Sequence, residues 1–199
     1  MSQVATYPIP EAAPQRGFRK PSLLGMGTVI WLASELMFFS GLFAAYFTIR
    51  AHDGTPWPPR ADKLDLLQSG IFSIILLASS ATCQKALWEA EHGRRRQAKW
   101  WLALTIVMGA AFVSNQGVEW NTLPFSASTN AFGSLFYIMT GLHGLHVILG
   151  LVALMALFGR LVGPGGDPGE LDAFQAVSYY WHFVDVVWIF IFSALFLLH

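Results

Sequence analysis

The chain has 199 residues and a formal net charge of zero; 54% of its residues are hydrophobic and only 12% are charged. Soluble domains carry about 25% charged residues, so this composition excludes an ordinary soluble domain and predicts an integral membrane protein. The neutral charge balance gives no basic surface for nucleic acid. The single cysteine, Cys83, excludes an internal disulfide or a paired-cysteine metal site.

Residues 1–22 are predicted to form a proline-rich N-terminal tail, with Pro8, Pro10, Pro14 and Pro21. The tail has no basic segment followed by a short apolar core and a small-residue cleavage site, so we expect no cleaved signal. The remaining residues, 23–199, are predicted to form one helical domain because the apolar windows within them are joined by short connections.

Five apolar windows are each long enough to cross a bilayer, which takes about 20 residues. They lie at roughly 24–49, 66–88, 100–120, 131–159 and 174–198. Backbone groups in hydrocarbon must be satisfied within the chain, so each window is predicted to be a helix. The windows lack the alternating pattern of a membrane barrel. The fold class is therefore all-α, a polytopic bundle of five transmembrane helices.

The distribution of lysine and arginine predicts the orientation of the bundle. Nine of these residues precede the first window, surround the connection between the second and third windows, or follow the fourth window. Arg50, Arg60 and Lys63 lie on the opposite side. Because basic residues favour the cytoplasmic side, we expect a cytoplasmic N-terminus and a C-terminus outside.

Two connections carry candidate contact residues. Trp57 lies among prolines in the first outer loop, where it is expected to anchor the chain at the membrane interface or to form part of a docking surface. The run Arg94-Arg95-Arg96 in the second connection is expected to be solvated and to touch anionic lipid head groups.

Six ionisable residues lie inside the windows or at their edges: Glu35, Glu119, His143, His146, His182 and Asp185. A charge inside a bilayer is costly, so such residues usually face a bundle interior and mark function. At 1.5 Å of rise per residue, Glu35, His143 and Asp185 lie about 16–18 Å from the ends of their windows, near the middle of a core about 30 Å thick. His146 and His182 lie one turn away, so we expect three helices to bury these groups together or against a partner.

The residues alone allow three interpretations of this cluster. Histidine and aspartate are suitable metal or haem ligands by type, but helical metal motifs usually supply more carboxylates, and nearby glycines favour close helix packing. A proton path would use the same residue types, but the chain has no broken helix or inverted repeat. A structural network would pair His182 with Asp185 and His143 with Glu35; the spacing favours this third interpretation.

The two glutamates carry separate predictions. Glu35 has no basic residue within two turns of it in the sequence, and an unpaired buried charge is costly. We therefore predict that Glu35 is protonated at neutral pH and reacts with an apolar carbodiimide. Glu119, at the outer end of the third window, either reaches interfacial water or bonds to a neighbouring helix.

Taken as a set, five segments resemble subunit III of the haem–copper cytochrome c oxidases. They are 34–39, 77–80, 116–119, 140–150 and 180–188, and they occur in the family's order over roughly residues 24–198. The last two are the most specific. The loop with Trp57 resembles that of short five-helix bacterial members, and the chain is most similar to the actinobacterial type. Long-form members have two further N-terminal helices around a lipid-holding cleft, and this chain has the proline-rich tail there instead.

The resemblance implies a non-catalytic subunit with no catalytic, cofactor-binding or metal-binding residues of its own. It implies direct packing against subunit I, with haem a and copper in partner subunits, support of proton uptake there, and bound phospholipids. By motif match, Glu35 corresponds to the family's membrane-buried glutamate. His143, His146, His182 and Asp185 correspond to the family's polar signature in the last two spans.

The resemblance also implies a setting for the complex. The assembled enzyme would be a redox-driven proton translocase of the bacterial plasma membrane that reduces oxygen to water with electrons from cytochrome c. Other oxidase subunits, and a cytochrome bc complex in a supercomplex, would be further partners. The alternatives are subunit III of a quinol oxidase, an accessory subunit of nitric oxide reductase and, from another class, an independent proton-coupled carrier.

Overall fold

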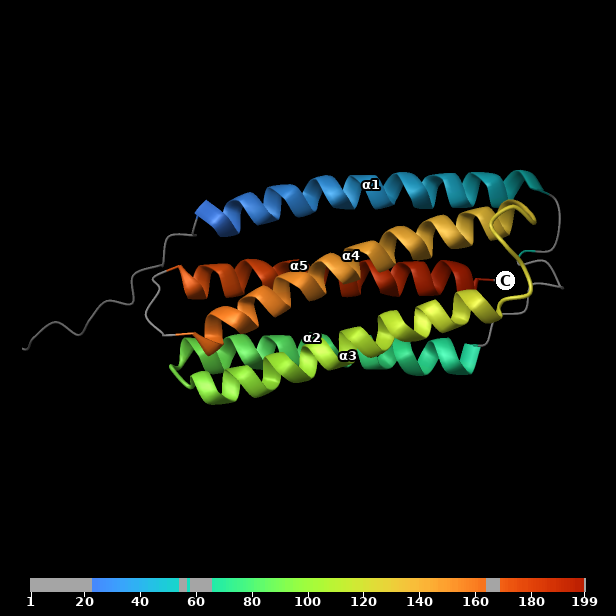
Figure 1. Ribbon diagram of the computed structural model, residues 1–199. Coiled ribbons are helices and arrows are strands. Elements are labelled where there is room, and N and C mark those ends of the chain that lie inside the picture. Colours follow the sequence, from blue (N-terminus) through green and yellow to red (C-terminus); the bar gives the residue numbers. More distant parts are fainter. Residues whose placement is uncertain (1–22, 54–56, 58–65, 164–168, 199) are drawn as a thin grey trace, which may run out of the picture.

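The computed structural model describes residues 23–53, 57, 66–163 and 169–198. Five α-helices follow one another, and the last continues as a π-helix: α1 (Leu23–Asp53), α2 (Leu66–Glu91), α3 (Arg95–Thr122), α4 (Ala131–Val162), α5 (Glu170–Phe192) and η1 (Ser193–Leu197) (Figure 1). Each α-helix is long and apolar enough to cross a membrane, which confirms the predicted all-α bundle of five transmembrane helices. The predicted tail, residues 1–22, lies outside the described residues.

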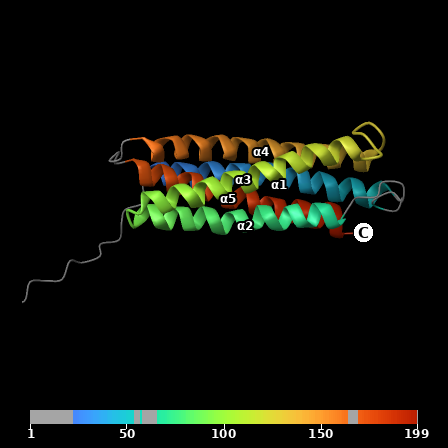
Figure 2. The same ribbon diagram turned by 60° about the horizontal axis from the view of Figure 1, so that its bottom comes forward.

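Four helices form a closed ring and the fifth packs on its edge. Helix α2 contacts α3, α3 contacts α4, α4 contacts α5, and α5 returns to α2. Helix α1 packs mainly on α5 and touches α4, so it lies along one side of the bundle with the α2–α3 pair on the far side (Figures 1 and 2). Helix α5 is the most buried of the five spans, because it contacts α1, α2 and α4.

Two tryptophans of α5 fill the centre of the ring. Trp181 and Trp188 are almost fully buried, and their indole N–H groups donate to Ser79 Oγ at 2.9 Å and Ser73 Oγ at 2.8 Å on α2. Lipid tails are as apolar as the helix surfaces, so the hydrophobic effect does little to drive helix association in a membrane. Close contact at small residues and interhelical hydrogen bonds stabilise the packing instead. Each tryptophan combines both effects, since a small serine admits its ring and also satisfies its N–H.

Helices α2 and α3 share the largest helix–helix interface of the bundle. Three side-chain hydrogen bonds cross it, each 2.7 Å long: Thr82 to Thr105, Gln68 to Asn115, and Ser69 to Glu119. Ser69 donates to Glu119 Oε1, and Glu119 is 8% exposed. Of the two expectations for Glu119, the structure therefore shows the bond to a neighbouring helix.

A set of interlocked contacts joins α1 to α5 at the end of the bundle where α1 ends. Tyr46 donates to the carbonyl of Ala194, in η1, at 2.7 Å, and Trp57 donates to the hydroxyl of Tyr46 at 2.9 Å. Trp57 also packs edge-on against Phe132 of α4. Trp57 is only 6% exposed, so the expected exposed anchor or docking residue is an internal packing residue, because its N–H finds a partner inside the chain.

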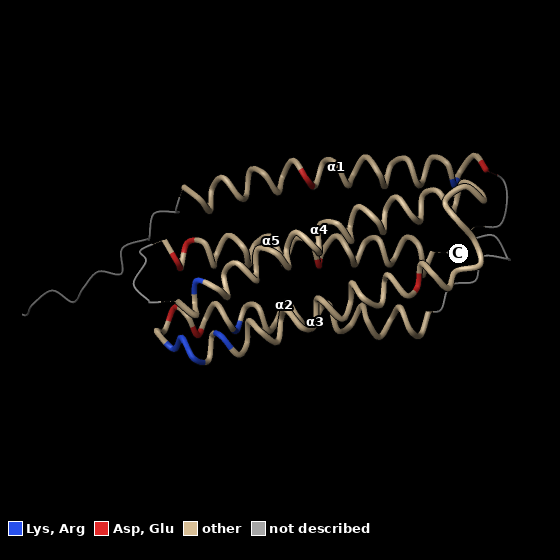
Figure 3. The backbone as a smooth tube through the Cα atoms, viewed as in Figure 1, with Lys and Arg blue, Asp and Glu red and all other residues tan. Residues whose placement is uncertain are grey.

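Lysine and arginine residues gather at the opposite end of the bundle, near the α2–α3 turn (Figure 3). Arg94 pairs with Glu89 and lies over the ring of Trp88. Arg95 pairs with Glu170 at 3.2 Å. The run is therefore largely exposed, as expected: Arg94 and Arg96 are exposed, although Arg94 also pairs with Glu89, whereas Arg95 is half-buried and joins α3 to α4 and α5.

Candidate functional site

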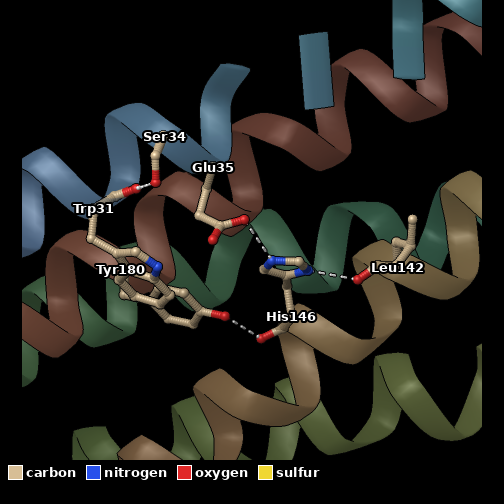
Figure 4. Close-up of polar contacts among 6 residues, drawn as sticks. All are labelled: Trp31, Ser34, Glu35, Leu142, His146 and Tyr180. Carbon is tan, nitrogen blue, oxygen red and sulfur yellow. Dashed lines mark hydrogen bonds and ion pairs between the residues drawn. The ribbon is translucent and has the colours of Figure 1, made fainter. Parts of the chain in front are cut away.

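An acid–base pair joins α1 to α4 halfway along the bundle. Glu35 Oε2 lies 3.3 Å from His146 Nε2 (Figure 4). The other ring nitrogen, His146 Nδ1, lies 2.7 Å from the carbonyl oxygen of Leu142. A carbonyl only accepts hydrogen bonds, so Nδ1 carries a proton. The contact between Nε2 and Oε2 then requires one further proton, held either by Glu35 as a carboxylic acid or by His146 as an imidazolium.

Aromatic rings hold this pair in place. Trp31 stacks on Tyr180 with ring centroids 5.2 Å apart, and Phe39 packs edge-on against His146 at 5.1 Å. Tyr180 donates its hydroxyl proton to the backbone carbonyl of His146 at 2.9 Å. The side chains of Glu35 and His146 are 22% and 11% exposed, so the pair lies at the edge of the bundle with one side open.

A second polar cluster connects α2 with α5. Ser80 donates to Asp185 Oδ2, and Ser80 Oγ lies 2.9 Å from His182 Nδ1. His182 Nε2 lies 3.2 Å from Gln84 Oε1. The predicted pairing of His182 with Asp185 is therefore indirect, since the Ser80 hydroxyl stands between the two. We name these four residues, Ser80, Gln84, His182 and Asp185, the serine-bridged cluster.

His143 lies apart from both groups. It is fully buried, with its ring stacked on Trp188 at 4.8 Å and edge-on to Phe112 at 6.0 Å. Neither ring nitrogen has a hydrogen-bond partner among the described residues. The predicted pairing of His143 with Glu35 is wrong, and His146 takes that place. The two histidines are three residues apart, so rotation about the helix axis directs one toward α1 and the other into the ring.

Four of the predicted groups therefore form two separate arrangements, and His143 stands alone, instead of one connected cluster. Among the described residues, no group of three or more His, Cys, Asp and Glu side chains is placed to hold a metal ion. The pair formed by Glu35 and His146 is arranged to share a proton. The serine-bridged cluster is arranged to fix α5 against α2, with Asp185 almost fully buried.

Sequence reasoning missed several residues that complete the site. Tyr180 orients the His146 segment through the backbone, and Gln84 extends the serine-bridged cluster toward the surface. Gln84 follows Ser80 by four residues, so the pair could have been recognised as one polar face of a helix. Tyr180 gives no such signal, because its role depends on a backbone carbonyl of another helix.

Comparison with known proteins identifies the family to which this chain belongs. The family model described as cytochrome c oxidase subunit III matches residues 15–198. A probable cytochrome c oxidase subunit 3 of Mycobacterium leprae is 45% identical over 180 residues, which is 89% of each chain. A cytochrome c oxidase subunit 3 of Corynebacterium diphtheriae is 39% identical over 192 residues, 93% of this chain and 94% of that one.

The similarity extends beyond actinobacteria. A cytochrome c oxidase subunit 3 of Thermostichus vulcanus is 36% identical over 180 residues, again 89% of each chain. All five helices, both arms of the Glu35–His146 pair and the whole serine-bridged cluster lie within the matched range. The chain therefore belongs to the cytochrome c oxidase subunit III family.

Proposed function

We propose that this chain is the non-catalytic subunit III of a proton-pumping cytochrome c oxidase in an aerobic respiratory chain. Haem a and copper would lie in partner subunits, where oxygen is reduced to water. The relatives are named for cytochrome c, which favours cytochrome c over quinol as the electron donor and disfavours the nitric oxide reductase alternative. The chain would stabilise subunit I, support proton uptake into it and bind lipid.

The observation that carries this proposal is the proton-sharing pair of Glu35 and His146. The pair lies halfway along two membrane helices, is braced by aromatic rings and has one side open. Ionisable residues within spans usually face a bundle interior or a functional partner. An acid–base pair at this place supports a role beside a proton-translocating partner. The pair would exchange a proton with that partner or stabilise a proton close to it.

We propose subunit I as the direct partner, followed by other oxidase subunits and a cytochrome bc complex in a supercomplex. The basic end of the bundle, with Lys85, Arg94, Arg95, Arg96, Lys99 and Arg160, would face the cytoplasm of a bacterial plasma membrane. In this orientation Arg96, which is exposed, would touch anionic head groups.

Phospholipids would occupy the apolar surface on the inner half of α1. A groove of about 290 Å³ lies there between α1, α4 and α5, beside the stacked pair Trp31 and Tyr180. Its other lining residues are mainly small or apolar: Thr28, Leu149, Ala153, Ala176 and Val177. An acyl chain fits this lining because it meets almost no polar atom.

The test is removal of the chain from the oxidase. The complex should be purified from strains with and without this subunit, and the number of turnovers before inactivation should be measured at saturating cytochrome c. We expect the enzyme without the subunit to turn over at first and then to inactivate sooner. An unchanged number of turnovers would contradict the supporting role.

Purification separates the oxidase subunit from an independent carrier. An affinity-tagged chain should co-purify with haem a and copper, and native mass spectrometry should show it in a complex with other oxidase subunits. Recovery of the chain alone, stable and without haem, would contradict the assignment. A haem b and haem o spectrum in place of haem a would contradict the choice of electron donor.

A further inference from the structure

The serine-bridged cluster forms a continuous line of hydrogen bonds from a buried acid to the surface of the bundle. Asp185 is almost fully buried, Ser80 and His182 are half-buried, and Gln84 is exposed. Ser80 bonds to Asp185 Oδ2, and its Oγ lies 2.9 Å from His182 Nδ1. His182 Nε2 lies 3.2 Å from the Gln84 amide. The line therefore has one buried end and one open end.

Each step of this line moves about one turn toward the basic end of the bundle. On α5, which begins at that end, His182 precedes Asp185 by three residues. On α2, which ends there, Gln84 follows Ser80 by four residues. The open end of the line is therefore the end nearer to the side that we propose faces the cytoplasm.

Gln84 adjoins the level at which α2 leaves the membrane. Its neighbour Lys85 pairs with Glu89 at 3.2 Å and lies 3.9 Å from the ring centre of Trp88. Lysine and tryptophan side chains are typical of the interface between membrane and water. A proton from the membrane surface can therefore reach the Gln84 end of the line, whereas Asp185 lies inside the bundle.

The four groups have two complete hydrogen-bonding arrangements, which differ by one proton. In the first, Asp185 is ionised and accepts from Ser80. The Nδ1–H of His182 then donates to Ser80, and Nε2 accepts from the Gln84 amide N–H. In the second, Asp185 is protonated and donates to Ser80, which donates to Nδ1. The Nε2–H then donates to the Gln84 carbonyl oxygen. Hydroxyl, neutral imidazole and amide groups can each both donate and accept, so the line stays intact in either arrangement.

The surroundings of Asp185 favour the uptake of a proton. Within the described ranges its carboxyl group has one hydrogen-bond donor and no cationic neighbour, and Oδ1 is buried without a partner. Cys83 of α2 is an ionisable neighbour, but a thiol brings no positive charge. Glu35 of α1 pairs with His146 of α4, and His143 of α4 packs against aromatic rings. A carboxylate with so little compensation is costly to bury.

We propose that the serine-bridged cluster is a proton relay, through which Asp185 exchanges its proton with water at the basic end of the bundle. A hydronium ion gives a proton to His182 Nε2 and becomes water. The Nδ1 proton of His182 passes to Ser80 Oγ, and the Ser80 proton passes to Asp185 Oδ2. The Gln84 amide turns over, and the imidazole and hydroxyl are neutral again. The proposal goes beyond the supporting role of the Glu35–His146 pair, because it gives the chain a proton-transfer activity of its own.

Exchange of the Asp185 proton for deuterium, followed by infrared spectroscopy, tests the relay. The chain should be reconstituted in lipid vesicles within the complex with which it co-purifies. The carboxylic acid carbonyl band that is lost in Asp185→Asn belongs to this residue, and its downshift in deuterated water reports exchange. We expect the band to be present at neutral pH and to shift. A missing band, or a band that never shifts, would overturn the proposal.

Two substitutions separate a relay from a static network. Ser80→Ala removes the hydroxyl, and His182→Asn keeps an N–H toward Ser80 but has no ring to pass a proton through. Each should slow the shift about 100-fold, the lower end of what a positioned acid–base group contributes to proton transfer. Ser80→Thr keeps the hydroxyl and should exchange as the unchanged protein does. Unslowed exchange in Ser80→Ala and His182→Asn would overturn the proposal.

The matched control is Ser79→Ala, at the neighbouring serine of α2. Ser79 accepts the Trp181 indole N–H at 2.9 Å, so it belongs to the packing of the ring and not to the cluster. Its substitution should weaken the packing without slowing exchange. Equal slowing by Ser79→Ala and Ser80→Ala would show that exchange follows packing, which contradicts the relay.

The relay and the proposed function fail separately. If Ser80→Ala and His182→Asn leave exchange unchanged while removal of the chain shortens the enzyme's lifetime, the relay is wrong and the supporting role stands. If exchange slows as expected while removal leaves the lifetime unchanged, the relay stands and the supporting role is wrong.

Discussion

Helices α2 and α1 are both predicted membrane spans, but they are held in the bundle in different ways. Helix α2 buries eight of its 26 residues, whereas α1 buries two of its 31, Phe39 and Tyr46. Helix α2 is joined to its neighbours by serines and threonines that bond across the interface. Helix α1 is held by a few specific contacts. The four-helix ring is thus packed by its own residues, and α1 has most of its surface left for lipid or a partner.

The largest effect is expected inside the ring. In Gly109→Ala, the new methyl group would lie 2.7 Å from Cη2 of Trp181 and 2.9 Å from Cδ2 of Leu151. Overpacking of this kind costs about 1–3 kcal/mol. Unfolding in mixed micelles should show this loss of stability.

The matched control is Gly117→Ala on the same helix, where nothing described lies within 4 Å of the added methyl group. It should leave stability unchanged or raise it slightly, because alanine favours helix. Equal stability of the Gly109→Ala and Gly117→Ala proteins would contradict the tight packing described for the ring.

The attachment of the C-terminal end of α1 to η1 should be the next most sensitive to substitution. Tyr46→Phe removes the bond to the Ala194 carbonyl and the acceptor of the Trp57 N–H, both in a buried site. We expect a loss of about 1–2 kcal/mol, measured by thermal unfolding in detergent. Tyr179→Phe, at a residue that is 41% exposed, is the control. A loss no larger than that of the control would show that this contact set does not hold α1.

A smaller effect is expected from the mid-depth pair. A double-mutant cycle with Glu35→Ala and His146→Ala should give a coupling energy of about 0.6 kcal/mol, with an upper limit near 1.7 kcal/mol for interhelical bonds in membranes. The partial exposure of both side chains keeps the expected value near the lower figure. A coupling energy of zero, from unfolding in mixed micelles, would mean that the two groups do not interact.

The smallest effect is expected at the basic end. Arg95 pairs with Glu170 at 3.2 Å and lies 3.2 Å from the Leu161 carbonyl, with 31% of its side chain exposed. Because solvent screens such a pair, Arg95→Ala should cost at most about 1 kcal/mol. Arg96→Ala, at an exposed neighbour, should cost close to nothing in the same unfolding assay. A larger loss for Arg96 than for Arg95 would contradict the described contacts.

The fold could be predicted from the sequence because an apolar run of about 20 residues has few other solutions in a membrane. The first four windows fall within α1–α4, which are longer, whereas the fifth window begins inside α5 and extends through η1 to Leu198. Helix α3 begins at Arg95, five residues before its predicted window. Arg95 is charged, so hydropathy alone does not place it in a membrane helix. Its bonds to α4 and α5 form only in the assembled bundle.

The site could be predicted only in part. Counting residues gives the depth of a side chain along a helix, and this count placed Glu35 and the histidines near one level. The direction of a side chain around the axis depends on which helices pack beside it. His143 and His146 are therefore equivalent in the sequence, but only His146 meets Glu35. The serine between His182 and Asp185 could not be deduced for the same reason.

The most direct test of the account is the lifetime of an oxidase that carries Glu35→Leu in this subunit. Turnovers before inactivation should be counted for the assembled complex, with assembly checked by native mass spectrometry. Ser34→Ala is the control, since its hydroxyl bonds only to the Trp31 carbonyl of the same helix. We predict that Glu35→Leu inactivates sooner, as the enzyme without the subunit does, and that Ser34→Ala behaves like the unchanged protein. An assembled Glu35→Leu enzyme with an unchanged lifetime would contradict the claim that the Glu35–His146 pair supports the oxidase.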